Sequence, residues 1–281
     1  MDKSLTLERW SRRLLAVAGV AFVFTGLSFF LLPEYAAENF PWNVSPLVAM
    51  TIGGWALGLG LMALETVRSW FMARVIGSLL AVWSFAILET VVVIGFLGVL
   101  RTDQWLTWPY LAGLLFGVGS AVLGLPVAWL RRRELRAEPD DGDEMPRPIR
   151  LVFAGFATVV FALAATTLLV TPVGSAVFPE PISAFTTRAF AAFFASLGFG
   201  ALPLLVARAV DPAVDYSRAG LYLVVLITAA AFSFLHVFDF AARPGQLIYV
   251  GAYALTAVVA LAIVMWHRGR TDAPRWRHSA E

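Results

Sequence analysis

Long runs of apolar residues, bounded by charged or turn-forming residues, recur eight times along the chain. Crossing about 30 Å of hydrocarbon at about 1.5 Å per residue takes roughly 20 apolar residues, and each run is close to this length. Within a bilayer, a single segment can satisfy its own backbone hydrogen bonds only as a helix. The pattern predicts an all-α, polytopic transmembrane helical bundle of about eight helices, at 14–32, 47–64, 75–97, 110–130, 151–170, 184–207, 221–240 and 247–266.

The composition favours the same class of protein. Hydrophobic residues make up 59% and charged residues 14% of the 281 positions, and the mean hydropathy is +0.77. Soluble domains carry about a quarter charged residues, so water is not the main solvent of this chain. The expected partner is the lipid bilayer. The net charge of +2 is not arranged as a basic stripe, so no nucleic acid is expected.

Arginine and lysine are distributed unevenly between the two sets of loops. If the N-terminus is cytoplasmic, all 21 basic residues except Arg101, Arg188 and Arg243 fall on the cytoplasmic side. Cytoplasmic loops of membrane proteins carry such an excess, so both termini are predicted to be cytoplasmic. Arginine in place of lysine and abundant alanine indicate a GC-rich prokaryotic genome. We therefore expect a multi-pass protein of the prokaryotic cytoplasmic (inner or plasma) membrane.

The two halves of the chain share an internal pattern. Arg13 precedes the first run as Arg150 precedes the fifth, and Gly-Leu-Gly at 58–60 corresponds to Gly-Phe-Gly at 198–200. Four spans per copy would give both copies the same orientation, as in a parallel repeat. Chance similarity between apolar helices is the alternative. The predicted organisation is a first four-helix repeat at 10–130, a charged cytoplasmic linker at 131–149, a second repeat at 150–267 and a basic cytoplasmic tail at 268–281.

Each predicted unit has an arginine before its first helix, a proline-bearing outer loop and a Gly-rich second helix, such as GGWALGLG at 53–60. In these features the unit resembles the small DoxX-like four-helix bacterial membrane proteins. The resemblance covers nearly the whole chain as two tandem copies. It implies a four-helix fold for each copy and assigns no functional residue.

Recognisable catalytic and cofactor motifs are missing from the sequence. The chain has no cysteine, which excludes disulfides, thiolate metal sites, iron–sulfur clusters and covalent c-type haem. It contains no HExxH, GxSxG, P-loop or dinucleotide-binding motif and no acidic metal-binding cluster. We therefore predict no metal site, and the sequence identifies no cofactor. An axial haem or chlorophyll ligand is one alternative use of His236.

Glu89 places a carboxyl group within an apolar run, about 22 Å of helix beyond Arg74. Insertion of an acidic residue at such depth costs roughly 2.5–3.5 kcal/mol, so Glu89 needs a partner, a proton or water. His236 and Asp239 lie near the outer end of the seventh run, and the repeat maps Glu89 one helical turn from His236. If these faces meet, Glu89 and His236 pair, with Asp239 and Arg188 closer to the surface. The pair would relay protons, act as acid and base or bind a ligand; the alternative is a hydrogen bond that only fixes packing.

Two tryptophans, Trp55 and Trp83, lie inside predicted spans. Both are candidates for an aromatic ligand site, and Trp83 is grouped with the polar residues above as a candidate site residue. The alternative for both indoles is packing within the bundle or against lipid.

Other features predict packing and surface contacts. Gly54 and Gly58 are spaced for one helix face, which lets two helix backbones approach closely. Glu65 and Arg68 are expected to form an ion pair with each other at the inner end of the second span.

These observations leave three functional hypotheses. The first is a non-enzymatic membrane protein that is an accessory subunit of a larger complex or binds a small apolar ligand. The second is a secondary transporter with a pseudosymmetric core and a protonatable Glu89. The third is an intramembrane enzyme that modifies lipids or isoprenoids with Glu89 and His236. A protein partner or a second copy of the chain is compatible with the first hypothesis.

Overall fold

The computed structural model describes residues 3–130, 144–169 and 178–271. In these segments the regular structure is helical, without strands and with one isolated β-bridge between Glu144 and Ala209. Eight of the described helices are long and apolar enough to cross a membrane, which confirms the predicted fold class. They are α1 (Lys3–Leu31), α3 (Pro46–Arg68), α4 (Met72–Gly95), α5 (Thr107–Leu130), α6 (Arg147–Leu169), α7 (Ala184–Ala201), α8 (Asp211–Ser233) and α9 (Gln246–Thr271).

Short helical elements connect several of the long helices. The seven-residue helix α2 (Pro33–Asn39) lies between α1 and α3, and 3-10 turns are present at η1 (Leu97–Val99), η3 (Leu202–Leu205) and η4 (Leu235–Val237). The predicted linker and tail fall largely outside the described residues, at 131–143 and 272–281.

The helix borders follow local sequence signals. Ser45 and Ser183 cap α3 and α7, because each side-chain oxygen accepts a hydrogen bond from a backbone N–H of the first turn. The predicted seventh span, 221–240, is wrong at both ends: α8 begins at Asp211, has Pro212 in its first turn and ends at Ser233. Proline suits a first turn because its missing N–H would have no helical partner there.

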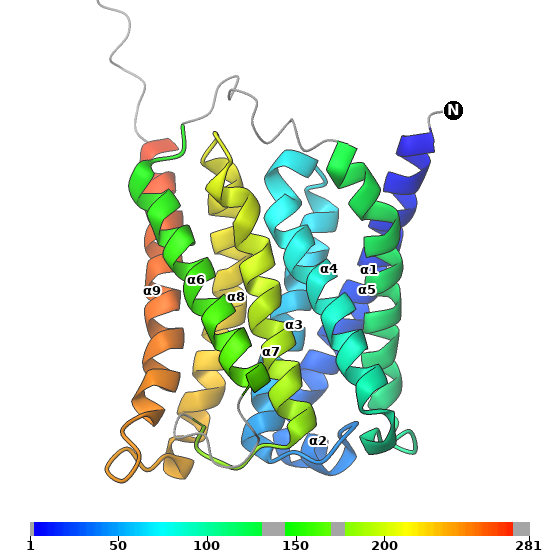
Figure 1. Cartoon of the computed structure of the whole chain (residues 1–281), viewed down its shortest axis with the longest axis vertical. Coiled ribbons are helices and arrows are strands. Elements are labelled where there is room, and N and C mark those ends of the chain that lie inside the picture. Colours follow the sequence, from blue (N-terminus) through cyan, green and yellow to red (C-terminus); the bar gives the residue numbers. More distant parts are fainter. Residues whose placement is uncertain (1–2, 131–143, 170–177, 272–281) are drawn as a thin grey trace, which may run out of the picture.

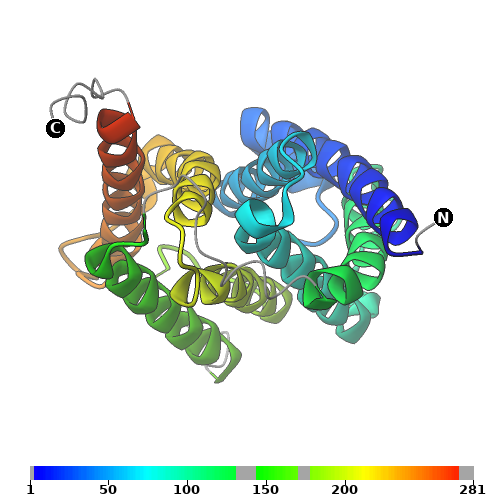
Figure 2. The same ribbon diagram turned by 90° about the horizontal axis from the view of Figure 1, so that it is seen from above.

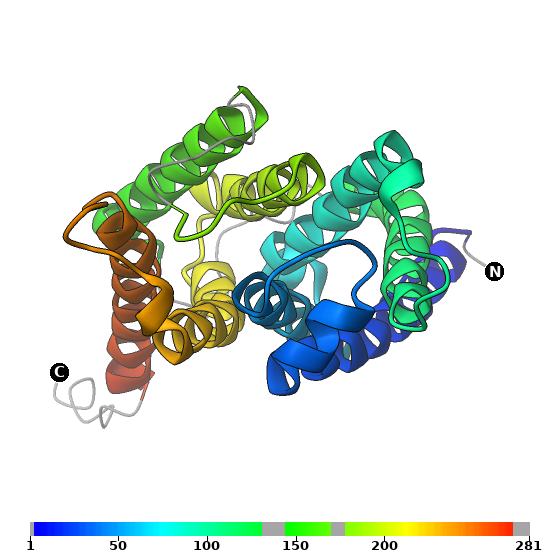
Figure 3. The same cartoon turned by 90° about the horizontal axis from the view of Figure 1, so that it is seen from below.

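The helices form two groups that lie side by side (Figure 2). The first half contains α1, α3, α4 and α5, and the second contains α6, α7, α8 and α9. The start of α1 and the end of α9 lie at the same end of the bundle (Figure 1), which we call the termini end. The opposite end carries α2 and is called the α2 end (Figure 3). Between the halves, α3 packs against α8 and α4 packs against α7.

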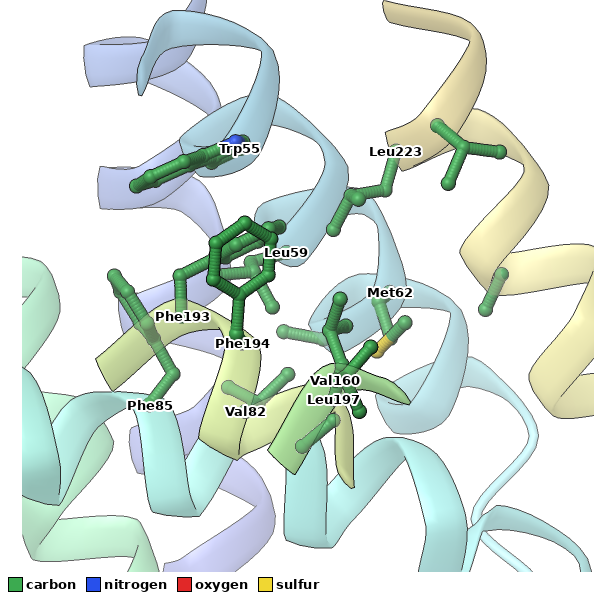
Figure 4. Close-up of a cluster of buried hydrophobic side chains, with 14 of the residues drawn as sticks. Trp55, Leu59, Met62, Val82, Phe85, Val160, Phe193, Phe194, Leu197 and Leu223 are labelled. Atoms are coloured by element: carbon green, nitrogen blue, oxygen red, sulfur yellow. The ribbon is translucent and has the colours of Figure 1, made fainter. Parts of the chain in front are cut away.

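Aromatic and small residues fill the junction between the halves. Trp55 of α3 stacks on Phe193 of α7 with ring centroids 4.1 Å apart, and both side chains are buried (Figure 4). Gly58 faces Leu223 of α8 so closely that a Cβ atom would lie 2.6 Å from the Leu223 Cβ. The predicted role of Gly58 in helix packing is thus observed, at a contact between the two halves.

Ion pairs join the halves at the termini end. Arg218 of α8 lies 2.7 Å from Glu65 of α3 and 3.1 Å from Asp215, and Arg74 of α4 lies 2.8 Å from Asp215. The predicted pairing of Glu65 with its neighbour in sequence, Arg68, is therefore wrong. The carboxylate of Glu65 points across the junction, where the guanidinium of Arg218 comes from another helix.

The two halves differ in how they close. In the first half α1 packs along α5, which completes a four-helix bundle. The helices in the same chain positions of the second half, α6 and α9, do not pack along each other. α6 packs on α7, and α9 packs on α8. The second half is consequently open between α6 and α9.

Candidate functional site

Glu89 is buried inside the first half of the protein. Its side chain is 2% exposed and projects from α4 toward α5, where the hydroxyl of Tyr110 donates a hydrogen bond of 2.6 Å to its Oε1 atom. The other carboxyl oxygen, Oε2, is buried and has no hydrogen-bond partner among the described residues. Tyr110 therefore satisfies only one of the two carboxyl oxygens of Glu89.

A small cavity of about 20 Å³ lies beside Glu89. It is bordered by α1, α3, α4, α5 and α7, so both halves contribute to its wall. Two further buried polar atoms without a hydrogen-bond partner belong to residues of this wall, Thr25 Oγ1 and Trp55 Nε1. The rest of the wall is dominated by aromatic rings, those of Phe22, Phe29, Trp42, Phe85 and Tyr110.

The cavity lies toward the α2 end and is closed there. Glu89 precedes the last residue of α4 by six positions, or about 9 Å of helix, so it lies nearer the α2 end than the middle of the span. Trp42, in the loop after α2, contributes to the cavity wall, and its indole N–H donates to Thr186 Oγ1 of α7 at 3.0 Å. The ring of Phe40 packs edge-on against Trp42 with centroids 4.5 Å apart. These buried rings separate Glu89 from the α2 end.

The structure does not bring Glu89 and His236 together. Helix α8 ends at Ser233, so His236 lies beyond it in the 3-10 turn η4, where its side chain is exposed and its ring is 5.9 Å from that of Phe234. His236 does not border the Glu89 cavity. The expectation of one shared helical face assumed that α8 continued to residue 240, and this assumption fails.

Asp239 and Arg188 have local structural roles. The Oδ1 atom of Asp239 accepts a hydrogen bond of 3.0 Å from the backbone N–H of Ala242, which shapes the exposed turn after η4. The Nη1 atom of Arg188 donates to the carbonyl oxygens of Thr167, at 2.8 Å, and Leu168. These carbonyls belong to the last turn of α6, which has no further helical partners for them. A cation suits this position because the carbonyl end of a helix carries partial negative charge.

Trp83 is a packed core residue. Its side chain is 1% exposed, and its indole N–H donates to Ser120 Oγ at 2.9 Å. A Cβ atom at Gly124 would lie 2.3 Å from the Trp83 ring, so the glycine makes room for the indole. Trp83 does not border the Glu89 cavity, and the packing interpretation describes its surroundings.

A larger groove of about 300 Å³ lies in the second half, between α6, α7, α8 and α9. Buried side chains such as Phe153 and Leu223 form its floor, and exposed apolar residues such as Val159 and Leu255 form its rims on α6 and α9. No local feature of the sequence predicts this groove, because it results from two helices, α6 and α9, that do not pack together. Gly220 and Ala252, which line it, have the small side chains that such a groove needs.

The described residues contain no cluster of three or more His, Asp or Glu side chains that could hold a metal ion. Two features of the described residues are therefore considered as candidate sites, the closed cavity beside Glu89 and the open apolar groove. Comparison of the chain with family models, with curated proteins and with solved structures finds no match, so the resemblance to DoxX-like proteins stays a prediction.

Proposed function

We propose that this multi-pass membrane protein binds an apolar chain, the tail of a membrane lipid, in the groove between α6 and α9. The observation that carries the proposal is the open side of the second half. The groove measures about 300 Å³, at the lower end of the range of ligand pockets, which is about 300–1,000 Å³. Its rims are exposed apolar residues of helices that are long and apolar enough to span a membrane, so lipid tails would lie directly beside it.

The chemistry of the groove favours an apolar occupant. Among the described residues, no charged side chain lines the groove, and the side chains with polar groups are those of Tyr216, Ser217 and Thr256. The hydroxyl of Tyr216 donates to the carbonyl of Leu197 at 2.8 Å, and that of Thr256 to the carbonyl of Ala252 at 2.7 Å. Since these two hydroxyls are already bonded to backbone, a polar ligand would find few partners. A hydrocarbon tail needs none.

Photo-crosslinking with a lipid that carries a diazirine in its acyl chain tests the proposal. Gly220 borders the groove, and a Cβ atom there would meet no other atom within 4 Å, so Gly220→Leu should fill the groove without disturbing helix packing. Gly155→Leu is the matched control, because Gly155 is also unobstructed but does not border the groove. We expect crosslinks on α6 and α9 in the wild type and in Gly155→Leu, and their loss in Gly220→Leu. Equal labelling of all three proteins would rule out the groove as a lipid site, and labelling of a co-purified protein instead would favour an accessory subunit.

The proposed orientation places the termini end in the cytoplasm of a prokaryotic cell. Support comes from the arginines, since Arg101, Arg188 and Arg243 are the only basic residues expected at the α2 end. The chain has no cysteine, so single cysteines report accessibility without background. In intact cells a membrane-impermeant maleimide should label Asp103→Cys, at the α2 end, and not Ser69→Cys. The reverse labelling would invert the orientation.

A proton-coupled transporter is a second candidate, favoured by the buried carboxyl group of Glu89. Proton-driven uptake by proteoliposomes would support it, and loss of uptake in Glu89→Gln would assign the proton to this residue. Unchanged uptake in Glu89→Gln would remove Glu89 from the mechanism. The enzyme hypothesis has less support, because the acid and base that it requires do not meet.

A further inference from the structure

We propose that the lipid in the groove between α6 and α9 is an anionic phospholipid from the leaflet at the termini end, with its head group beside Arg270. This inference rests on the proposed binding of a lipid tail and adds the leaflet and the charge of the ligand. Its basis is the position of the groove along the helices and the residues that follow the groove on α9.

The groove covers about the depth of one leaflet. Helices α6 and α8 begin at the termini end (Figure 1), and the residues with which they line the groove are 152–159 and 216–224. These stretches extend from about 7 Å to about 20 Å beyond the first residue of each helix. Each helix has 23 residues and is thus about 34 Å long. The groove therefore begins close to the termini end and stops near the middle of the bilayer, so a tail from that leaflet can fill it.

The face of α9 that lines the groove continues toward the termini end with aromatic and basic residues. The last lining residue on this helix is Ile263. Trp266, His267 and Arg270 follow it after three, four and seven positions, and these spacings keep them on the same face. The guanidinium of Arg270 lies over the Trp266 ring, 5.1 Å from its centroid. Along this face, hydrocarbon gives way to an indole and then to a cation, which is the order of tail, interface and head group in a lipid.

The cations at this end favour a negatively charged head group. Arg270 is exposed and lies about 10 Å of helix beyond Ile263, outside the depth that a tail in the groove would occupy. On the other rim, α6 begins with the exposed Arg147, about 7 Å of helix before Val152. Asp211 of α8 contacts His267, with Nε2 and Oδ1 3.6 Å apart. Arg270 is therefore the cation that we expect beside the head group.

Photo-crosslinking with two lipids of identical tails tests the charge of the head group. The full chain in phosphatidylcholine nanodiscs receives a small fraction of diazirine-labelled phosphatidylglycerol, which is anionic, or of phosphatidylcholine with the same label. We expect phosphatidylglycerol to label the groove more strongly, and Arg270→Gln to lower this preference about fivefold, the contribution of one arginine near an anionic surface. Arg13→Gln is the matched control and should leave the preference unchanged. Arg13 also lies over a tryptophan, 5.1 Å from the Trp10 centroid, but belongs to α1.

The position of the diazirine along the tail tests the leaflet. A label near the head group should react near Val152 and Ile263, and a label near the terminal methyl should react near Val159 and Leu255. The reverse order would place the head group toward the α2 end and overturn the inference.

Three results separate this inference from the proposed function. Equal labelling of the groove by both lipids would leave tail binding intact and overturn the anionic head group. A preference that Arg270→Gln leaves unchanged, or that Arg13→Gln lowers as much, would overturn the assignment to Arg270. The absence of groove labelling by either lipid would refute the tail site itself.

Discussion

Gly58→Ala adds one methyl group at the contact between Gly58 and Leu223. The resulting change in the free energy of unfolding tests how closely the two halves pack at this point. An alanine Cβ at position 58 would lie 2.6 Å from the Cβ and 2.7 Å from the Cα of Leu223. Ordinary van der Waals contacts lie at 3.4–4 Å, and the Cα atom belongs to the backbone, so side-chain rotation cannot relieve the clash. In Gly58→Ala, α3 and α8 must therefore move apart by roughly 1 Å, which is the difference between the 2.6 Å separation and an ordinary van der Waals contact.

Two opposing terms set the magnitude of the effect. Overpacking of a well-packed contact costs about 1–3 kcal/mol. Alanine also favours a helix over glycine by about 1 kcal/mol, which partly masks this cost. Gly251 in α9 is a matched control, because it is exposed and a Cβ there meets nothing within 4 Å. Gly251→Ala changes only the helix propensity and adds no clash. The two variants should therefore differ by the overpacking cost, about 1–3 kcal/mol in the free energy of unfolding.

Unfolding in mixed micelles with increasing SDS, followed by circular dichroism, measures this difference. We expect Gly58→Ala to unfold at a lower SDS fraction than Gly251→Ala. A Gly58→Ala protein as stable as the Gly251→Ala control would show that α3 and α8 are not in backbone contact at this point. The proposed arrangement of the halves would then be refuted.

Further predictions concern the polar contacts. Arg218→Gln removes the ion pair to Glu65 and should lower the free energy of unfolding by up to about 1 kcal/mol at low salt, with a smaller loss at high salt; a salt-independent loss would contradict an electrostatic origin. Ser120→Ala leaves the buried indole N–H of Trp83 without its acceptor and should cost about 1–3 kcal/mol in the same assay, whereas no loss would mean that the indole finds another partner. Arg188→Gln should speed amide hydrogen exchange in the last turn of α6, measured by mass spectrometry, and unchanged exchange would show that the guanidinium does not stabilise this end.

The membrane-spanning helices were predictable because their signal is local. Each span needs a sufficient run of apolar residues, and this condition can be read from one segment at a time. For α8 the span was predicted but its bounds were wrong, because Asp211, Asp215 and Arg218 lie in the first turns of the helix and break the apolar run there. Two of these side chains take part in ion pairs that join the halves at the termini end. The charged first turns of α8 thus have partners on other helices, which the local sequence does not show.

The candidate site was predictable only in part. Glu89 stood out because a carboxyl group in an apolar run demands a partner, and this reasoning needs no knowledge of the fold. Its actual partner, Tyr110, belongs to α5, and the sequence does not indicate which helix faces Glu89. The predicted partner, His236, depended on an assumed helix end and an assumed meeting of faces. The apolar groove left no local signal, since a missing contact between two helices changes no single residue.

The predicted repeat relates the first half, which holds the Glu89 cavity, to the second half, which holds the apolar groove. Under it, Glu89 and Tyr110 correspond to Ser233 and Tyr249, so the second half keeps the tyrosine and lacks the carboxyl group. The hydroxyl of Tyr249 lies 3.3 Å from Thr51 of the first half, and Ser233 is exposed and bonded to its own helix. A buried acid requires a closed surrounding, which the first half obtains where α1 packs on α5. In the described part of the second half no carboxyl group takes the place of Glu89, and its outer helices stand apart and leave the groove in which we propose that a lipid tail binds.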